Sequence, residues 1–78
     1  MITFLRGKIS FLNENSIEID VSGVGYKCMV SLNTSKFYSD KVNDEIMILT
    51  YHHINETTQA LFGFFEKEEK DMFELLIS

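Results

Sequence analysis

The chain has 78 residues, 45% of them hydrophobic, and carries a formal net charge of −5. A chain of this length forms one small domain, which buries roughly 60 to 65% of the surface of its unfolded state. The acidic balance argues against a domain that grips duplex DNA by itself, because phosphate neutralisation needs a basic surface. Arg6 and Lys8 interrupt the apolar N-terminal segment, so we expect no signal sequence and no membrane span, and predict a soluble intracellular protein.

Two alternating segments begin the chain. Apolar side chains occupy every second position from Leu5 to Phe11 and again from Ile17 to Val21. A period of two is typical of half-buried strands, and "NENS" between them predicts a turn, so the two segments should form an antiparallel hairpin. The glycines of "SGVGY" then predict a sharp bend or bulge before a third strand. In that strand Cys28, the only cysteine, is expected to be a small core residue.

The middle of the chain changes character. Residues 33–35, "NTS", are capping or turn residues, and Phe37 and Tyr38 are adjacent apolar anchors, so we expect a short connecting helix. Residues 45–54 are apolar on both faces of the strand that they predict. One face holds Ile46, Ile48 and Ile54, and the other holds Met47, Leu49 and Tyr51. A barrel strand needs one inward face, so the second should be covered by a helix or by another subunit.

The last third predicts a returning strand and a helix. "NETT" turns the chain, and residues 60–65, "ALFGFF", form the strand, with Gly63 at a bulge or a tightly packed position. Residues 66–78 switch to helical spacing. Their expected apolar face holds Met72, Phe73, Leu76 and Ile77. No helix-ending signal follows, so we expect the chain to be a fragment of a longer protein.

These elements predict a mainly β fold. Five strands, a short connecting helix and a C-terminal α-helix are typical of a small β-barrel of the OB or SH3-like kind. We expect the barrel in residues 1–65 and the start of the terminal helix in residues 66–78.

His52, His53 and Glu56 are the candidate ligands for a metal ion. Neighbouring residues of a strand point to opposite faces, so the two histidines cannot share an ion unless the strand is broken, and no third imidazole or thiol is present. We therefore expect two ordinary strand histidines, one inward or interfacial and one solvated. The sequence also has no nucleophile elbow and no phosphate loop, so we predict no catalytic residue, no metal and no cofactor.

Aromatic side chains offer an alternative function. An OB-fold can stack the bases of a single strand on aromatic rings that lie among basic residues. The candidate rings are Phe4, Tyr26, Phe37, Tyr38, Tyr51, Phe62 and Phe64. Few basic residues lie among them, which favours core and interface roles. A free-standing OB-fold module that binds single-stranded nucleic acid or a protein partner stays open as the second hypothesis.

Four motifs together resemble a known family. The start "MITFLRG", the bend "GVGY", the strand end "LFGF" and the acidic helix "EKEEKDMFELLI" resemble the N-terminal domain of RuvA, the Holliday-junction recognition subunit of the RuvAB branch-migration helicase. The resemblance implies an OB-like, non-catalytic domain of a bacterial cytoplasmic homotetramer. It also implies a helix-hairpin-helix domain beyond residue 78 that grips four-way junction DNA, and a further domain that contacts the RuvB ATPase. The acidic balance is then no objection, because the duplex-gripping surface lies mainly elsewhere.

The same resemblance assigns roles to the turn in "HHINETTQ". In the family this hairpin carries an acidic pin that projects into the junction centre. Asn55 takes the position of the pin's basic residue, Glu56 that of its first acid and Thr57 that of its second acid, so only Glu56 keeps the family's charge. Clustering of these domains around a four-fold axis would cover the face of Met47, Leu49 and Tyr51.

Overall fold

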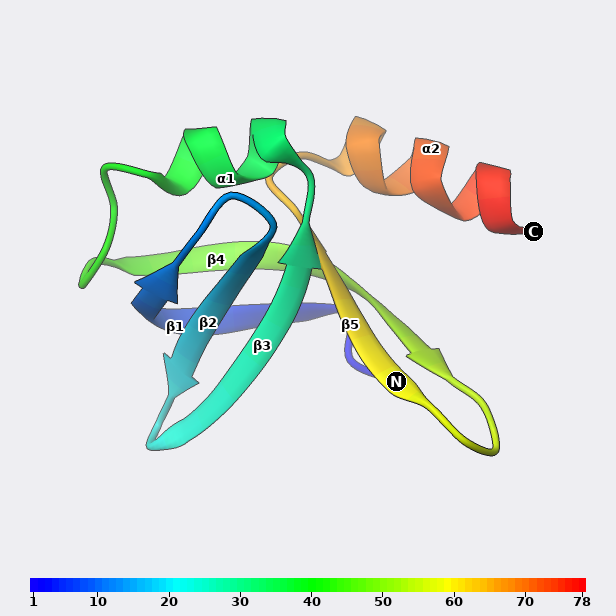
Figure 1. Cartoon of the computed structure of the whole chain (residues 1–78), viewed down its shortest axis with the longest axis horizontal. Coiled ribbons are helices and arrows are strands. Elements are labelled where there is room, and N and C mark those ends of the chain that lie inside the picture. The colour runs from blue at the N-terminus through cyan, green and yellow to red at the C-terminus, as the bar shows by residue number, and fades with distance from the viewer.

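A computed structural model, which describes residues 1–78, shows a closed five-stranded barrel with two helices (Figure 1). In chain order its elements are β1 (Phe4–Leu12), β2 (Ser16–Val21), β3 (Val24–Val30), α1 (Leu32–Tyr38), β4 (Glu45–Ile54), β5 (Gln59–Phe64) and α2 (Lys67–Ile77). The strands close in the order β1-β2-β3-β5-β4. Every pairing is antiparallel except that of β3 with β5. The predicted OB-like barrel with a short connecting helix and a C-terminal helix is confirmed.

The core follows the alternation of the sequence. Eight side chains form the buried cluster: Leu5, Ile9, Ile17, Ile19, Cys28, Tyr38, Ile48 and Leu61. Burial raises the pKa of the Cys28 thiol to about 12, because a low-dielectric surrounding disfavours the thiolate. Cys28 is thus the small core residue that its position predicted.

The alternation of β1 ends at a bulge. The register with β2 shifts between Ile9 and Phe11, and an extra residue at such a point reverses which side chains face inward. Phe11 is consequently 51% exposed, so the prediction that its side chain continues the inward row is wrong.

The "SGVGY" bend is a tight hairpin turn between β2 and β3. Ser22 and Gly23 have φ angles of 52° and 91°, and positive values at both central positions match the right-handed twist of the flanking strands. The backbone N–H of Gly23 donates to Oδ1 of Asp20 at 2.8 Å. Gly25 differs, since a Cβ there would meet nothing within 4 Å.

The N-cap of helix α1 lies two residues before Asn33, the first of the capping residues that the sequence suggested. Ser31 is its N-cap, and the Ser31 hydroxyl accepts a hydrogen bond from the backbone N–H of Thr34 at 3.2 Å. Thr34 and Ser35 are buried rather than serving as caps. The Ser35 hydroxyl donates to the carbonyl of Asn13 at 2.7 Å, which joins α1 to the β1–β2 turn.

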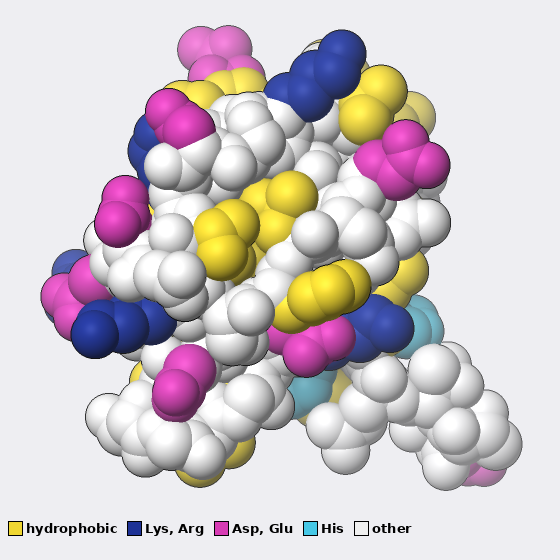
Figure 2. Space-filling model, turned by 60° about the vertical axis from the view of Figure 1, so that its left-hand side comes forward, with side chains coloured by type: hydrophobic (Ala, Val, Ile, Leu, Met, Phe, Trp, Pro, Cys, Tyr) yellow, Lys and Arg dark blue, Asp and Glu magenta, His cyan; other side chains and the backbone are white.

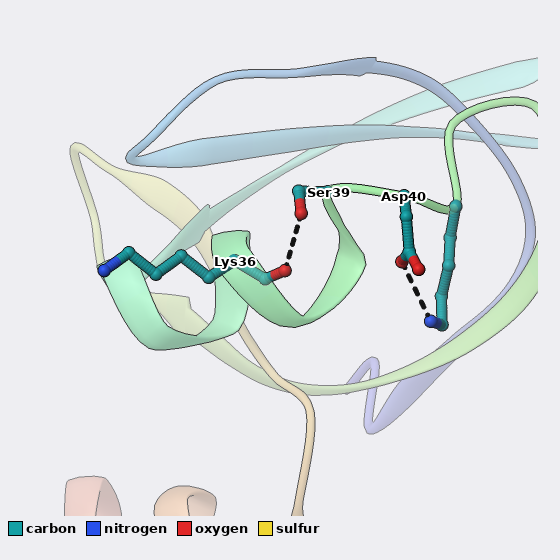
Figure 3. A network of polar contacts seen from close by, with 4 residues as sticks. Lys36, Ser39 and Asp40 are labelled. Carbon is teal, nitrogen blue, oxygen red and sulfur yellow. Dashed lines mark hydrogen bonds and ion pairs between the residues drawn. The ribbon is translucent and has the colours of Figure 1, made fainter.

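The C-terminal end of α1 is held by short polar contacts (Figure 3). The Ser39 hydroxyl donates to the carbonyl of Lys36 at 2.7 Å. The ammonium of Lys41 donates to Asp40 at 3.1 Å, and this bond holds the pKa of the Asp40 carboxyl below its usual range. Tyr38 is buried and its hydroxyl donates to the carbonyl of Met47 at 2.9 Å, which fixes α1 to β4.

The C-terminal end of strand β4 extends beyond the barrel. Ile48 and Thr50 point inward and are fully buried, whereas Ile54, on the same expected face as Ile48, is 53% exposed. The reason is its place at the far end of β4, where only β5 pairs with it. Gly63, which lies opposite Thr50, is tightly packed as expected, because a Cβ on Gly63 would lie 2.7 Å from Cδ1 of Ile48.

Helix α2 covers the barrel only in part. Phe73 packs against Tyr51, Phe62 and Phe64, with ring centroids 5.0 to 5.7 Å away. The other members of the expected apolar face, Met72, Leu76 and Ile77, are 63%, 77% and 48% exposed. The predicted helix is present, but its apolar face is only partly buried. Neither helix is long and apolar enough to cross a membrane.

Candidate functional site

The β4–β5 hairpin projects beyond the barrel (Figure 1). Strand β4 pairs with β1 only from Glu45 to Leu49, whereas its pairing with β5 continues to Ile54 opposite Gln59. The end of the hairpin is therefore supported on one edge only. In the space-filling view it stands out from the body as a narrow lobe of mostly uncharged side chains (Figure 2).

Asn55 organises the tip of this hairpin. Its side-chain Oδ1 accepts hydrogen bonds from the backbone N–H groups of Thr57 at 3.0 Å and Thr58 at 2.7 Å. The hydroxyl of Thr57 reaches the same oxygen at 3.3 Å. This is an Asx turn, in which the side chain replaces a backbone acceptor. Asn55 is thus occupied in shaping the turn.

Glu56 has the opposite character. Its side chain is exposed, and the two ion pairs of the structure, Lys41–Asp40 and Lys67–Asp71, do not involve it. The structure therefore gathers Asn55, Glu56 and Thr57 in one exposed turn in which Glu56 carries the only charge.

The two histidines lie in the stem of the hairpin. His52 accepts a hydrogen bond at Nδ1 from the backbone N–H of Ile2 at 3.2 Å, and its Nε2 lies 3.3 Å from Oε1 of Gln59. His53 instead lies 3.2 Å from the side-chain amide of Asn55. No group of three or more His, Cys, Asp or Glu side chains gathers anywhere in the chain to hold a metal ion. The link from His52 to Ile2 spans 50 residues, and no sequence pattern signals it.

The outer face of β4 is divided between two surroundings. Tyr51 lies against Phe73 of α2, with ring centroids 5.7 Å apart, so a helix covers this end. Met47 is 46% exposed, and Phe4, which lies opposite Leu49 in the β1–β4 register, is 50% exposed. Sequence reasoning did not place Phe4 on this strip, although its alternation with Leu5 offered the signal. Phe4, Met47 and Leu49 form an apolar strip that we call the β1–β4 strip.

The fold and this hairpin define a class, that of small OB-like interaction domains built around a closed barrel with one projecting loop. The family model described as the RuvA N terminal domain matches residues 1–63, and the chain belongs to this family. Its resemblance to the family, based on four motifs, is therefore confirmed.

Relatives cover the whole chain. The chain is 42% identical over 78 residues to a protein of Oceanobacillus iheyensis and to one of Leptospira biflexa, both named Holliday junction branch migration complex subunit RuvA. A protein of the same name from Bdellovibrio bacteriovorus is 42% identical over 73 residues, or 94% of the chain. The chain spans 38%, 39% and 37% of the length of these three relatives.

Proposed function

We propose that the chain is the first domain of a Holliday-junction-binding subunit of a branch-migration complex, which acts in DNA recombination and repair. The relatives' names support this function. In this role the domain has no chemistry of its own and centres the junction. Its partners are four-way junction DNA, other copies of the same chain in a homotetramer, and a RuvB-type ATPase bound through a region outside residues 1–78. The setting is the bacterial cytoplasm.

The projecting hairpin is the observation that carries the proposal. Its tip is narrow, is ordered by Asn55, and presents the exposed carboxylate of Glu56. Within a junction it acts as the pin, with Glu56 as its charged group and with Asn55 and Thr57 shaping the turn. Because the pin stands away from the barrel, it reaches the crossover while the barrel stays outside the duplex arms.

The pin works by repulsion. A carboxylate about 8 Å from a phosphate costs on the order of 0.5 to 2 kcal/mol for effective dielectric constants of about 80 to 20, and salt reduces this further. One such charge has little effect, whereas four around an axis act together at the crossover. They disfavour strands that cross the centre and direct separated strands into neighbouring arms. The effect falls on migration, because duplex affinity depends on other surfaces.

A chimera tests this proposal. The 78 residues replace the matching segment of the Oceanobacillus iheyensis relative, and junction binding and RuvB-driven branch migration are measured for the chimera and for Glu56→Gln and Glu56→Lys. We expect the chimera to prefer a four-way junction over linear duplex. We expect both variants to keep junction affinity within about threefold and to change the migration rate by more than that, with Glu56→Lys showing the larger change because it reverses the charge.

The matched control is Glu14→Gln, since Glu14 is also exposed but lies in the β1–β2 turn. It should leave both measurements unchanged. Migration rates that stay the same in both Glu56 variants would remove the pin role. A chimera that binds linear duplex as tightly as the junction would overturn the function itself.

A further inference from the structure

A cleft opens at the seam of the barrel beside the hairpin. Strands β3 and β5 pair only from Cys28 to Val30 with Leu61 to Gly63, so their remaining residues diverge toward the hairpin end. The cleft between them has a volume of about 380 Å³, which lies in the range of small-molecule sites. Its lining residues are Ile2, Tyr26, Lys27, Met29, His52, Gln59, Ala60 and Leu61.

Hydrogen bonds fix one wall of the cleft in place. Ile2 is held by two hydrogen bonds, from its N–H to Nδ1 of His52 at 3.2 Å and from the Thr50 hydroxyl to its carbonyl at 2.7 Å. Thr50 is fully buried, so this N-terminal segment is tied to the barrel rather than lying loosely on it. The ring of Tyr26 and the side chain of Leu61 add further flat and apolar surface.

The polar groups of the cleft lie at its edge. Gln59 lies 3.3 Å from His52 through its Oε1, and this leaves its amide N–H groups available to an acceptor. Lys27 is exposed and takes no part in either ion pair of the structure, although Glu18 lies opposite it on β2. The cleft therefore combines an aromatic ring, amide donors and one cation at the rim.

We propose that this cleft binds one unpaired nucleotide of a separated DNA strand. The base enters beside Tyr26, its edge accepts hydrogen bonds from Gln59, and its phosphate contacts Lys27. Aromatic stacking and a cation on the backbone are the two elements of single-strand binding, and the half-buried Tyr26 and the exposed Lys27 would supply them at the cleft. The inference rests on the proposed function, because His52 and Gln59 belong to the stem of the hairpin that would part the strands. One stack and one phosphate contact correspond to a Kd on the order of 1 mM.

An NMR titration of the 78-residue chain with the single-stranded trinucleotide of thymidine tests the cleft. Amide signals of Tyr26, Lys27, Gln59 and Leu61 should shift, while those of α1 stay in place. One neutralised phosphate predicts that log K falls with log salt at a slope of about −0.7. Lys27→Ala should weaken binding about threefold to tenfold, and Gln59→Ala should weaken it in the same direction.

Lys36→Ala is the matched control, since Lys36 is an exposed lysine on α1. It should leave the titration unchanged. Equal weakening by Lys27→Ala and Lys36→Ala would overturn the proposal. So would the absence of any shift at the cleft when the trinucleotide concentration reaches 10-fold the expected Kd, on the order of 10 mM. These variants retain Glu56 and the assay contains no junction. A failed pin and an empty cleft therefore give different results.

Discussion

The hydroxyl of Thr34 donates a 2.6 Å hydrogen bond to the carboxylate of Glu69 and so joins α1 to α2. The Ser31 hydroxyl donates to the other carboxylate oxygen at 2.8 Å. Helix α2 has no buried residue, and besides this contact it is held mainly by the ring of Phe73. Glu69 and Phe73 thus determine the direction in which α2 leaves the barrel.

Removal of the Glu69 carboxylate should loosen α2. Hydrogen bonds to charged groups contribute about 1.5 to 3 kcal/mol, and part of that is lost to solvent here, so we expect Glu69→Ala to lower the free energy of unfolding by about 1 to 2 kcal/mol. Urea denaturation measures this change, and faster amide exchange confined to α2 would locate it. Glu68→Ala removes an exposed neighbour without a hydrogen bond and should have little effect. Equal losses in both variants would contradict the role of Glu69.

The chain order of the elements and the core were predictable because each depends on local periodicity. Alternation identifies Ile17, Ile19 and Cys28 as buried without any knowledge of their partners. The exposure of Phe11 and Ile54 does not follow from alternation, since a bulge and a strand end are properties of the pairing between strands and not of one strand alone. The Glu69 contact was missed because 35 residues separate it from Thr34.

Gly63 should be intolerant of a side chain. A Cβ at this position would lie 2.7 Å from Cδ1 of Ile48 and 3.2 Å from Cβ of Cys28, and overpacking of this kind typically costs about 1 to 3 kcal/mol. We expect Gly63→Ala to be destabilised by this amount in thermal or urea denaturation. Ile48→Val removes the Cδ1 atom and should restore part of the loss in the double variant. Gly25→Ala, where nothing lies within 4 Å, is the control, and an equal loss there would refute the packing argument.

Cys28 should make the fold sensitive to alkaline pH. Burial raises the pKa of its thiol to about 12, whereas an unfolded cysteine ionises near pH 8.5. Above that pH the unfolded chain has released a proton that the folded chain still binds, so the stability falls as pH rises. By pH 10 the loss in the free energy of unfolding should reach about 2 kcal/mol. Urea denaturation at pH 8 and pH 10 measures it, and Cys28→Ala should show a smaller fall. The same fall in both proteins would exclude Cys28 as its origin.

The β1–β4 strip should form part of the interface of the proposed homotetramer. Met47 is 46% exposed beside Leu49 and Phe4, and a carboxylate placed there would lose its hydration upon assembly, although Arg6 lies opposite it on β1. We expect Met47→Asp to shift the chimera from tetramers toward smaller species in sedimentation velocity. Met72→Asp changes an even more exposed methionine on α2 and should leave assembly intact. Undisturbed tetramers in Met47→Asp would remove the strip from the interface.

The candidate site was less predictable than the fold. The turn at residues 55–58 follows from its asparagine and threonines, but its projection depends on where β1 stops pairing with β4, which no local pattern encodes. The cleft beside the hairpin likewise depends on how far β3 and β5 remain paired. Tyr26, Lys27 and Gln59 come together only through this topology.

A second acid at the tip of the hairpin should strengthen the proposed effect of the pin. Thr57 uses both its backbone N–H and its hydroxyl to bond Oδ1 of Asn55, and Thr57→Asp keeps the backbone bond while it adds a charge next to Glu56. Coulomb repulsion adds over charges, so two carboxylates should influence the branch-migration rate about twice as much as Glu56 alone. Thr57→Asp should therefore change the rate in the direction opposite to Glu56→Gln. Branch-migration rates of the chimera measure this, and Thr57→Asn separates the charge from the loss of the hydroxyl. If the Thr57→Asp and Thr57→Asn chimeras support the same branch-migration rate, charge at the tip does not govern migration, and the pin acts by its shape alone.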